Sequence, residues 1–298
     1  MTTVRSLDTS SADIHPIPFF NRQRLSKIGL WIGVILAVTW VVYPLAWAVI
    51  TSFKTQLQAL EPTFIPFVQF TPTAENWTQE LGLGGRETFA SLGNSAIISI
   101  GSTLLATTLG TLTGYALARF KFGVGNANVV SWVLSQRFLP PVVTIIPFFL
   151  ILQNLRLLDT HLGMILVNTT FTLPFAILIM RDYFAEFPDE IEEAALVDGA
   201  NPLQIFFRVA LPLALPALAA SAIICFAFAW NEYLFASVMT NRNAKPYTFL
   251  VASTSTVRGV HFGFLATRLL IAITLPVILS LFVQRYIVRG LTLGAVKG

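Results

Sequence analysis

Six long apolar segments follow one another along the chain, and shorter polar segments separate them. They lie near residues 28–50, 90–118, 127–153, 162–180, 212–239 and 266–288. Since a helix rises about 1.5 Å per residue, roughly 20 apolar residues are enough to cross the hydrocarbon layer of a bilayer. In lipid the backbone must satisfy its own hydrogen bonds, which continuous apolar segments of this length do as helices. The pattern predicts an all-α polytopic membrane protein with six transmembrane helices.

The composition agrees with this pattern. Of the 298 residues, 55% are hydrophobic and only 11% are charged, and the mean hydropathy is +0.71. A water-soluble protein of this length does not bury so much apolar surface, so we expect membrane lipid around the helices. The polar, basic segment 1–27 precedes the first apolar segment, which is longer than the hydrophobic part of a cleaved signal peptide. We therefore expect the first apolar segment, residues 28–50, to be retained in the protein as a membrane helix.

Basic clusters predict the orientation of these helices. The segments "NRQRLSK", "ARFKF" and "QRYIVRG" flank helix ends that would share one side of the membrane. Lys and Arg next to helix ends favour the cytoplasmic side. We therefore expect both termini to be cytoplasmic, with residues 181–211 as a cytoplasmic loop and residues 51–89 and 240–265 as outer loops. This bias accounts for the net charge of +4, so the charge predicts no nucleic-acid partner.

One polar segment has an unusual charge: "PDEIEEAALVDGANP", residues 188–202, in which five carboxylates fall within ten residues. Pro188 suits the first position of a helix, and the carboxylates after it favour the positive end of the helix dipole. Gly199 is expected to end that helix, and Asn201 with Pro202 to begin another. We expect a helix–glycine–helix elbow whose carboxylates attract a basic partner. The plain alternative is a solvated linker.

The second helix of the elbow is predicted to be amphipathic. Its apolar residues recur at the spacing of one helical face, namely Leu203, Phe206, Phe207, Ala210 and Leu211. On the first helix, the small side chains of Ala194 and Ala195 would let another surface approach closely. Both features favour a docking role over a linker.

The elbow resembles a known motif. Glu193-Ala194-Ala195, followed by Gly199 and then by Val209-Ala210-Leu211-Pro212, is similar to the EAA loop of binding-protein-dependent ABC importer permeases. Further segments resemble the carbohydrate branch of that family, of the maltose type (MalG-like). They are "GYALARFKF", "FLPPVVTIIPFFLIL", "LRLLDTHLGMIL", "FAWNEYLFA" and "RYIVRGLTLGAVKG", and they run in order along much of the chain.

This resemblance implies a type I ABC importer permease fold in a bacterial plasma (inner) membrane, with the elbow as the helix that couples to a separate ATPase subunit. The partners would be a second homologous permease subunit, two copies of the ATPase subunit and a periplasmic or extracellular solute-binding protein that contacts residues 240–265. The substrate would be a sugar or sugar derivative, and the tail "TLGAVKG" would reach toward the ATPase pair. The implied coupling residues are Glu193, Ala194, Ala195, Asp198, Gly199, Val209, Leu211 and Pro212.

No motif in the sequence indicates that this chain catalyses a reaction itself. A P-loop needs G-x-x-x-x-G-K-[ST], and "GTLTGYAL" lacks the lysine. The histidines His15, His161 and His261 are scattered, and the single cysteine, Cys225, has no partner. We expect no catalytic residue, no metal and no cofactor bound by this chain, with ATP-Mg held by the partner ATPase subunits.

Two charges inside apolar segments are candidates for the substrate pathway, because charge is costly in a membrane. They are Arg137 and Glu232, and the latter lies in a polar and aromatic cluster, Trp230, Asn231, Glu232 and Tyr233, that suits a hydroxyl-rich ligand. Alternatives stay open at both positions. Glu232 would contact outer-gate groups or the partner subunit, and Arg137 would pair with Glu232 or with an anionic substrate.

Two rival functions remain. An ion-coupled secondary transporter of a small polar solute is expected to carry several intramembrane carboxylates, and only Glu232 is available. A membrane-embedded enzyme needs a set of acid–base residues inside the bundle, such as paired His and carboxylate residues, and the sequence shows no such set. The sequence therefore favours the permease subunit of an ATP-driven importer, with the secondary transporter as the alternative.

Overall fold

The computed structural model describes residues 22–256 and 259–294 and divides into two units, residues 1–47 and 48–298. The first unit holds most of helix α1, Arg22–Ser52, which contains the expected helix 28–50 and has Pro44 inside it. Its described side chains up to Leu45 are all exposed, although most of them are apolar. Such a surface is suited to lipid rather than to water.

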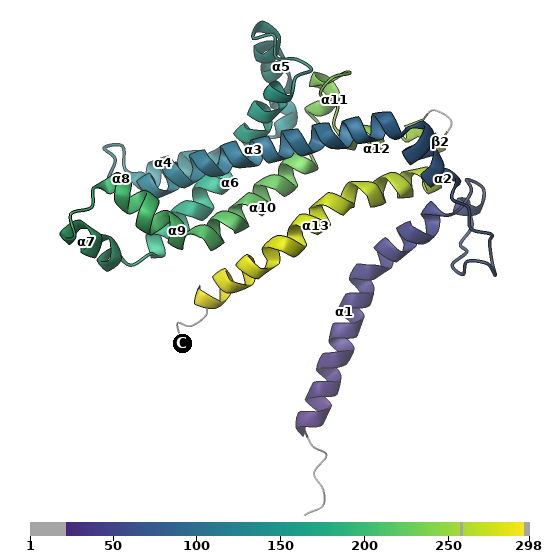
Figure 1. Ribbon diagram of the computed structural model, residues 1–298, viewed down its shortest axis with the longest axis horizontal. Helices are drawn as coiled ribbons and strands as arrows, with labels where there is room; N and C mark the ends of the chain where they lie inside the picture. Colours follow the sequence, from purple (N-terminus) through teal and green to yellow (C-terminus); the bar gives the residue numbers. More distant parts are fainter. Residues whose placement is uncertain (1–21, 257–258, 295–298) are drawn as a thin grey trace, which may run out of the picture. The chain divides into compact units, whose positions relative to one another are not determined.

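The second unit is helical almost throughout (Figure 1). In chain order its elements are η1 Gln58–Leu60, α2 Glu75–Thr78, η2 Gln79–Leu83, α3 Gly85–Arg119, α4 Asn126–Ser135, η3 Pro141–Thr144, α5 Ile145–Asn154, α6 His161–Glu186, α7 Asp189–Val197, α8 Pro202–Ile205, η4 Phe206–Ala210, α9 Leu211–Leu213, α10 Leu215–Trp230, α11 Ala236–Met239, α12 Tyr247–Ala252, β1 Ser255–Thr256, β2 Gly259–Val260 and α13 Phe262–Gly294. The two short strands pair antiparallel. The predicted all-α class is otherwise confirmed.

The number of spanning helices differs from the prediction. Among the described residues, four helices (α1, α3, α6 and α13) are long and apolar enough to cross a membrane. A fifth candidate is the pair Pro202–Leu213 and Leu215–Trp230, bent by 74°. The expected third helix, 127–153, is broken into α4, η3 and α5, because Pro140 and Pro141 cannot donate backbone hydrogen bonds. The expected fifth helix ends at Trp230 instead of continuing to 239.

Helices α3 and α6 form the central contact of the second unit, and they approach closely because α3 carries small residues at the interface. A Cβ atom on Gly110 would lie 2.4 Å from the Cβ of Ala176, and one on Gly114 would lie 2.7 Å from the backbone N of Arg181. Small residues spaced four apart are a general means of close helix packing in membranes. Serine and threonine hydroxyls on α3 bond to carbonyls of their own helix, as Ser99 does at 2.6 Å.

Substituting Gly110 by alanine should therefore loosen this contact. We expect Gly110→Ala to lower the free energy of unfolding by about 1–3 kcal/mol, because the new methyl overlaps Ala176. The matched control is Gly93→Ala on the same helix, where a Cβ meets nothing within 4 Å. That variant should be neutral or more stable by up to about 1 kcal/mol, since alanine is the better helix former. Thermal unfolding in detergent measures both, and equal effects would contradict the packing argument.

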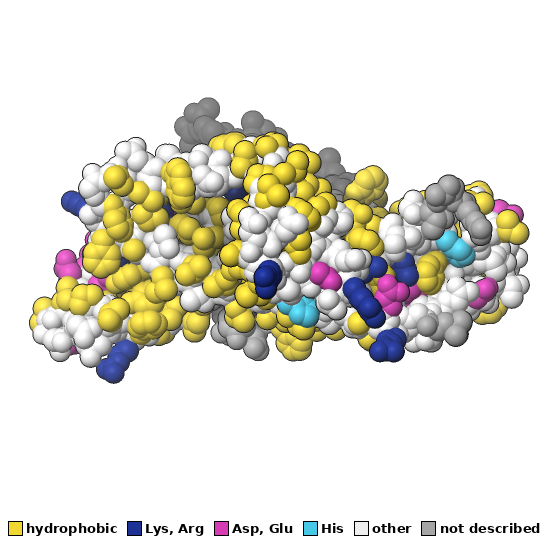
Figure 2. Space-filling view, turned by 90° about the horizontal axis from the view of Figure 1, so that it is seen from above, with side chains coloured by type: hydrophobic (Ala, Val, Ile, Leu, Met, Phe, Trp, Pro, Cys, Tyr) yellow, Lys and Arg dark blue, Asp and Glu magenta, His cyan; other side chains and the backbone are white. Residues whose placement is uncertain are grey.

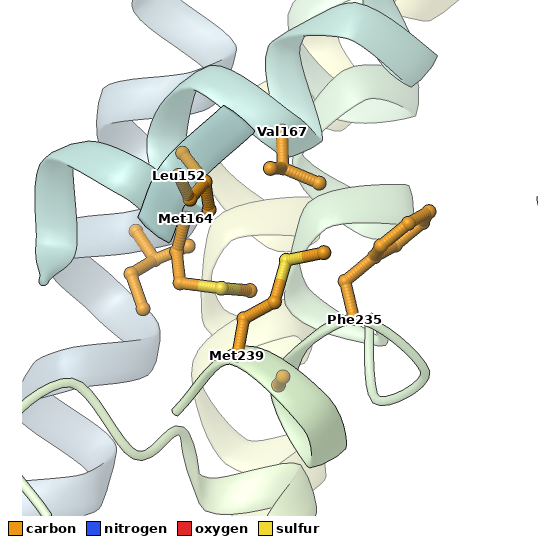
Figure 3. Close-up of a cluster of buried hydrophobic side chains, with 7 residues drawn as sticks. Leu152, Met164, Val167, Phe235 and Met239 are labelled. Carbon is orange, nitrogen blue, oxygen red and sulfur yellow. The ribbon is translucent and has the colours of Figure 1, made fainter. Parts of the chain in front are cut away.

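A second cluster of buried side chains anchors the broken third segment. Leu152 from α5, Met164 and Val167 from α6, and Phe235 with Met239 near α11 converge on one another (Figure 3). Helices α5 and α11 project together from α3 and α6 as a result (Figure 1). Hydrophobic side chains cover much of the face seen in Figure 2, and charged side chains lie at both ends of it and in a group right of its centre.

Candidate functional site

A cavity of about 1050 Å³ lies among α3, α4, α6 and the segment after α10. The structure brings four of the expected pathway residues to its wall, namely Arg137, Asn231, Glu232 and Tyr233. Trp230 does not line it. The indole instead donates a hydrogen bond to the Ala272 carbonyl at 3.1 Å and borders a second cavity of about 250 Å³ beside α13. Trp230 is therefore a packing residue between α10 and α13, not part of the large cavity.

The suggested ion pair between Arg137 and Glu232 does not form. The Arg137 guanidinium lies 3.4 Å from the ring centre of Phe175 on α6 and 5.5 Å from that of Phe228 on α10. The Glu232 carboxylate instead accepts the backbone N–H groups of Phe235 at 2.6 Å and Ala236 at 3.1 Å. Unpaired N–H groups at the start of a helix attract carboxylates, and α11 begins at this point.

Several polar residues of the cavity went unnoticed in the sequence. Asn168, Thr169 and Thr172 of α6 line it, and Asn168 is only 3% exposed. Their signal was available, because "VNTTFT" places polar side chains within an otherwise apolar spanning segment. Polar groups buried in a membrane helix usually face its protein neighbours or a cavity.

Two helices separated at Gly199 form in residues 188–205, as the sequence predicted. Helix α7 ends before Gly199, whose φ is +83°, and α8 begins after Asn201, whose side chain and Gln204 form a reciprocal capping box. Pro188 is the residue before α7 rather than its first residue. Of the expected docking residues, Glu193, Ala194, Asp198 and Gly199 are exposed and Ala195 is half-buried. Val209 and Leu211 are half-buried and Pro212 is exposed where the elbow joins α10.

The predicted apolar face of the second helix is wrong in part. Phe206 and Ala210 are buried against Tyr115, Met180 and Phe184. Leu203 and Phe207 are 70% and 57% exposed, and Ile205 is buried instead. Residues 206–210 are π-helical, and this wider turn rotates the side chains away from the 3.6-residue period.

Two of the elbow carboxylates bind within the chain. Arg119, at the end of α3, contacts Asp189 at 2.7 Å and Glu192 at 2.9 Å, and it donates to the Phe187 carbonyl at 2.9 Å. Tyr115 donates to the other oxygen of Glu192 at 3.1 Å. The carboxylates of this segment are predicted to attract a basic partner, and Asp189 and Glu192 instead bind within the chain. Glu190, Glu193 and Asp198 are exposed.

On the expected outer side, Asp159 joins two loops. Its φ is +55°, and its carboxylate accepts the backbone N–H groups of residues 241–244 at 3.0 to 3.2 Å. Burial alone would raise the pKa of Asp159, but these four N–H groups outweigh burial and hold the pKa below its ordinary value. The sequence showed no such pairing, because more than eighty residues separate the partners.

We expect Asp159→Ala to release the segment 241–244. Hydrogen exchange of these four amides should become at least about tenfold faster, because charge-assisted hydrogen bonds contribute about 1.5–3 kcal/mol. Asp182→Ala, a control at an exposed aspartate beside Arg181, should leave their exchange unchanged. Since the folded-state pKa is lowered, the stabilisation is complete above about pH 4 and is lost as pH falls below that value. A wild-type advantage that persists unchanged at lower pH would contradict this assignment.

A buried ionic cluster also lies on the expected outer side. Glu80 is fully buried and accepts hydrogen bonds from Thr88 at 2.7 Å, Tyr247 at 3.1 Å and Arg268 at 2.9 Å. Burial and the neighbouring carboxylate raise the pKa of Tyr247, so its hydroxyl stays protonated and donates. The sequence could have predicted a partner for Arg268, because this arginine lies inside the sixth apolar segment, where a charge needs a partner.

The remaining expectations concern the ends of the chain and metal binding. Residues 1–21, which make up most of the expected N-terminal segment, and the last four residues of the tail "TLGAVKG" lie outside the described residues. Within the described part, no group of three or more His, Cys, Asp and Glu side chains could hold a metal ion. Cys225 is buried between α3 and α6 side chains, next to Ala106 and Ala176.

Comparison with known proteins places this geometry in context. Residues 106–293 match the family model described as "Binding-protein-dependent transport system inner membrane component". The chain is 34% identical to the inner membrane ABC transporter permease protein YcjP of Escherichia coli (strain K12), over 93% of this chain and 99% of that one. It is 36% identical to the trehalose transport system permease protein SugB of Mycobacterium tuberculosis (strain CDC 1551 / Oshkosh), over 88% and 95%.

Among archaeal relatives, the trehalose/maltose transport system permease protein MalG of Thermococcus litoralis is 32% identical over 92% of this chain and 98% of that one. A solved bacterial ABC transporter, involved in the import of the acidic polysaccharide alginate, shares the fold with a TM-score of 0.70 at 22% identity. That likeness covers 91% of this chain and 99% of the other. The chain thus belongs to the family of binding-protein-dependent transport system inner membrane components, which confirms its resemblance to ABC importer permeases.

Proposed function

We propose that this chain is the transmembrane permease subunit of an ATP-driven importer of a sugar or sugar derivative. Relatives that align over most of this chain are named as trehalose or trehalose/maltose transport permeases. A diacetylchitobiose uptake permease and an alpha-glucoside transport permease are also similar to it. These names favour a sugar over an amino acid or a metal ion. The ion-coupled secondary transporter finds no support among them.

The proposed partners follow from the family and the elbow. A binding-protein-dependent component takes its solute from a separate binding protein, and we place that protein at the outer loop 240–265. A second homologous permease subunit would complete the pathway, and two copies of an ATPase subunit would supply ATP-Mg. Both termini would then be cytoplasmic. This chain would hydrolyse nothing itself.

The exposure of the elbow is the observation that supports the proposed contact with the ATPase subunit. Its position is set internally, because Arg119 holds Asp189 and Glu192. The neighbouring carboxylate of Glu193 and the apolar side chains of Leu203 and Phe207 stay exposed, although exposed apolar groups on a cytoplasmic surface are unfavourable unless a partner covers them. A partner with a basic rim and an apolar cleft fits this surface. The coupling residues proposed for it are those of the EAA motif and its connection to α10.

Co-purification tests this proposal. The tagged full-length chain is extracted in mild detergent, and co-purifying proteins are identified by mass spectrometry. We expect a second permease and an ATPase. A chain that purifies alone, and that moves solute into liposomes without ATP, would overturn the importer assignment and restore the secondary transporter.

A further inference from the structure

The guanidinium of Arg137 stands at the cavity wall with its hydrogen-bond donors unused. It contacts Phe175 with a ring-centre distance of 3.4 Å, which is a stacking distance. A guanidinium carries five N–H donors in its plane, so contact through its face leaves these donors available. Within the described part of the chain, no carboxylate pairs with Arg137 and no acceptor takes a hydrogen bond from it.

A second donor on the same cavity also lacks an acceptor. The side-chain amide of Asn168 is buried, and its Nδ2 atom has no hydrogen-bond partner among the described residues. A buried polar group without a partner costs about 1–3 kcal/mol, so native structures rarely keep one without a role. The accessible donors of Arg137 on the cavity wall indicate a ligand rich in hydrogen-bond acceptors, and the unsatisfied amide of Asn168 lies within the same wall.

The neighbouring hydroxyls complement these donors. Thr169 donates to the Ile165 carbonyl at 2.7 Å, and Thr172 donates to the Asn168 carbonyl at 2.9 Å. Since their hydrogens are directed to the backbone, their oxygens remain as acceptors. Hydroxyl groups of a sugar can donate to such oxygens. The wall therefore presents acceptors for hydroxyls next to donors for an anion.

Glu232, the one carboxylate among the described residues that line this cavity, does not compete for Arg137. Both oxygens of Glu232 accept backbone N–H groups at the start of α11. These hydrogen bonds hold the carboxylate to its own segment and offset part of its charge. The positive charge of Arg137 is thus left for a ligand.

We propose that Arg137 forms a subsite for the carboxylate of an acidic sugar. A planar carboxylate accepts two parallel N–H groups from a guanidinium, which a neutral sugar cannot do. The aromatic faces of Phe175 and Phe228 hold the guanidinium in place. This subsite rests on the proposed sugar transport and narrows its substrate to sugars that carry a negative charge.

Binding to the co-purified complex in detergent tests the subsite. The probes are cellobiouronic acid and its neutral counterpart cellobiose, measured by equilibrium dialysis at matched ionic strength. We expect the acidic disaccharide to bind at least about tenfold more tightly, as charge-assisted hydrogen bonds imply. Arg137→Gln should abolish this preference and leave the affinity for cellobiose within about twofold. Arg137→Lys, which keeps the charge but not the fork, should retain part of the preference.

Each other outcome overturns the subsite. If Arg137→Gln weakens both disaccharides equally, Arg137 serves only to pack α4 against α6 and α10. If the wild type shows no preference, the donors bind no carboxylate. Two competitors test other sources of the anion: inorganic phosphate, and vesicles of phosphatidylglycerol with phosphatidylcholine vesicles as their neutral control. If either anionic competitor displaces the acidic disaccharide at least as well as unlabelled acidic disaccharide does, the anion is not a sugar acid.

A matched control separates charge from site. Arg86→Gln removes an exposed arginine at the start of α3, outside the cavity lining, and should leave the preference intact. The proposed function fails separately, since the absence of a co-purifying ATPase would overturn the importer assignment. Recovery of the ATPase without a preference for the acidic disaccharide would overturn the subsite alone.

Discussion

Removing the buried carboxylate of Glu80 is expected to lower the free energy of unfolding by about 3–5 kcal/mol, because the largely buried guanidinium of Arg268 then has no carboxylate to balance its charge. The carboxylate also holds Thr88 and Tyr247, so three elements, α3, α12 and α13, lose a shared acceptor. Glu80→Ala should therefore unfold at a markedly lower temperature in detergent.

Two further variants test this expectation. Glu87→Ala removes a glutamate that is 62% exposed and lies 3.5 Å from Lys245, so the loss should be below about 0.5 kcal/mol. The double variant Glu80→Leu with Arg268→Met removes both buried charges and should regain a large part of the lost stability. If Glu80→Ala and Glu87→Ala unfold alike, the buried cluster does not stabilise the protein.

Transport should be lost on replacing Gly199 by proline, while the chain remains inserted in the membrane. Gly199 has a φ of +83°, which the proline ring cannot adopt. Its N–H also donates to the Leu196 carbonyl at 3.0 Å, and proline has no N–H to replace that hydrogen bond. The angle between α7 and α8 would change, and the docking surface with it. Uptake of substrate, with membrane insertion measured in parallel, checks this result.

The same position provides its own control. Asparagine tolerates positive φ better than other residues with a side chain, and a Cβ at this position meets nothing within 4 Å. Gly199→Asn should therefore retain most of the transport. If the proline variant transports normally, the elbow does not couple to an ATPase in the way proposed. If both variants fail equally, the effect is not one of backbone conformation.

The elbow shows why some local structure is readable from sequence. Its glycine, its Asn-Pro start and its carboxylates act through their nearest neighbours along the chain, and α7, the positive φ of Gly199 and the start of α8 after Asn201 form where expected. The face of the second helix was not readable in the same way. It depends on the π-helical turn at residues 206–210 and on contacts with Tyr115 and Phe184, which lie far away in sequence.

The apolar segments show the same division. Continuous hydrophobic runs predict α1, α3, α6 and α13 well, since each helix satisfies its backbone by itself. The third run contains Pro140 and Pro141, and its break could have been expected from those residues alone. The end of α10 at Trp230 coincides with the polar residues Asn231 and Glu232, and the Glu232 carboxylate accepts backbone N–H groups at the start of α11 instead of continuing the helix.

The sequence by itself determined the helical membrane class, the elbow and the family resemblance, because these depend on hydropathy and on residues close together in the chain. Only the tertiary structure decided which charges meet. It pairs Glu80 with Arg268, Asp159 with the backbone of residues 241–244, and Arg119 with Asp189 and Glu192. It also leaves Arg137 without a carboxylate partner among the described residues. A charge in a low-dielectric interior takes the nearest complementary group, and folding alone decides which group is nearest.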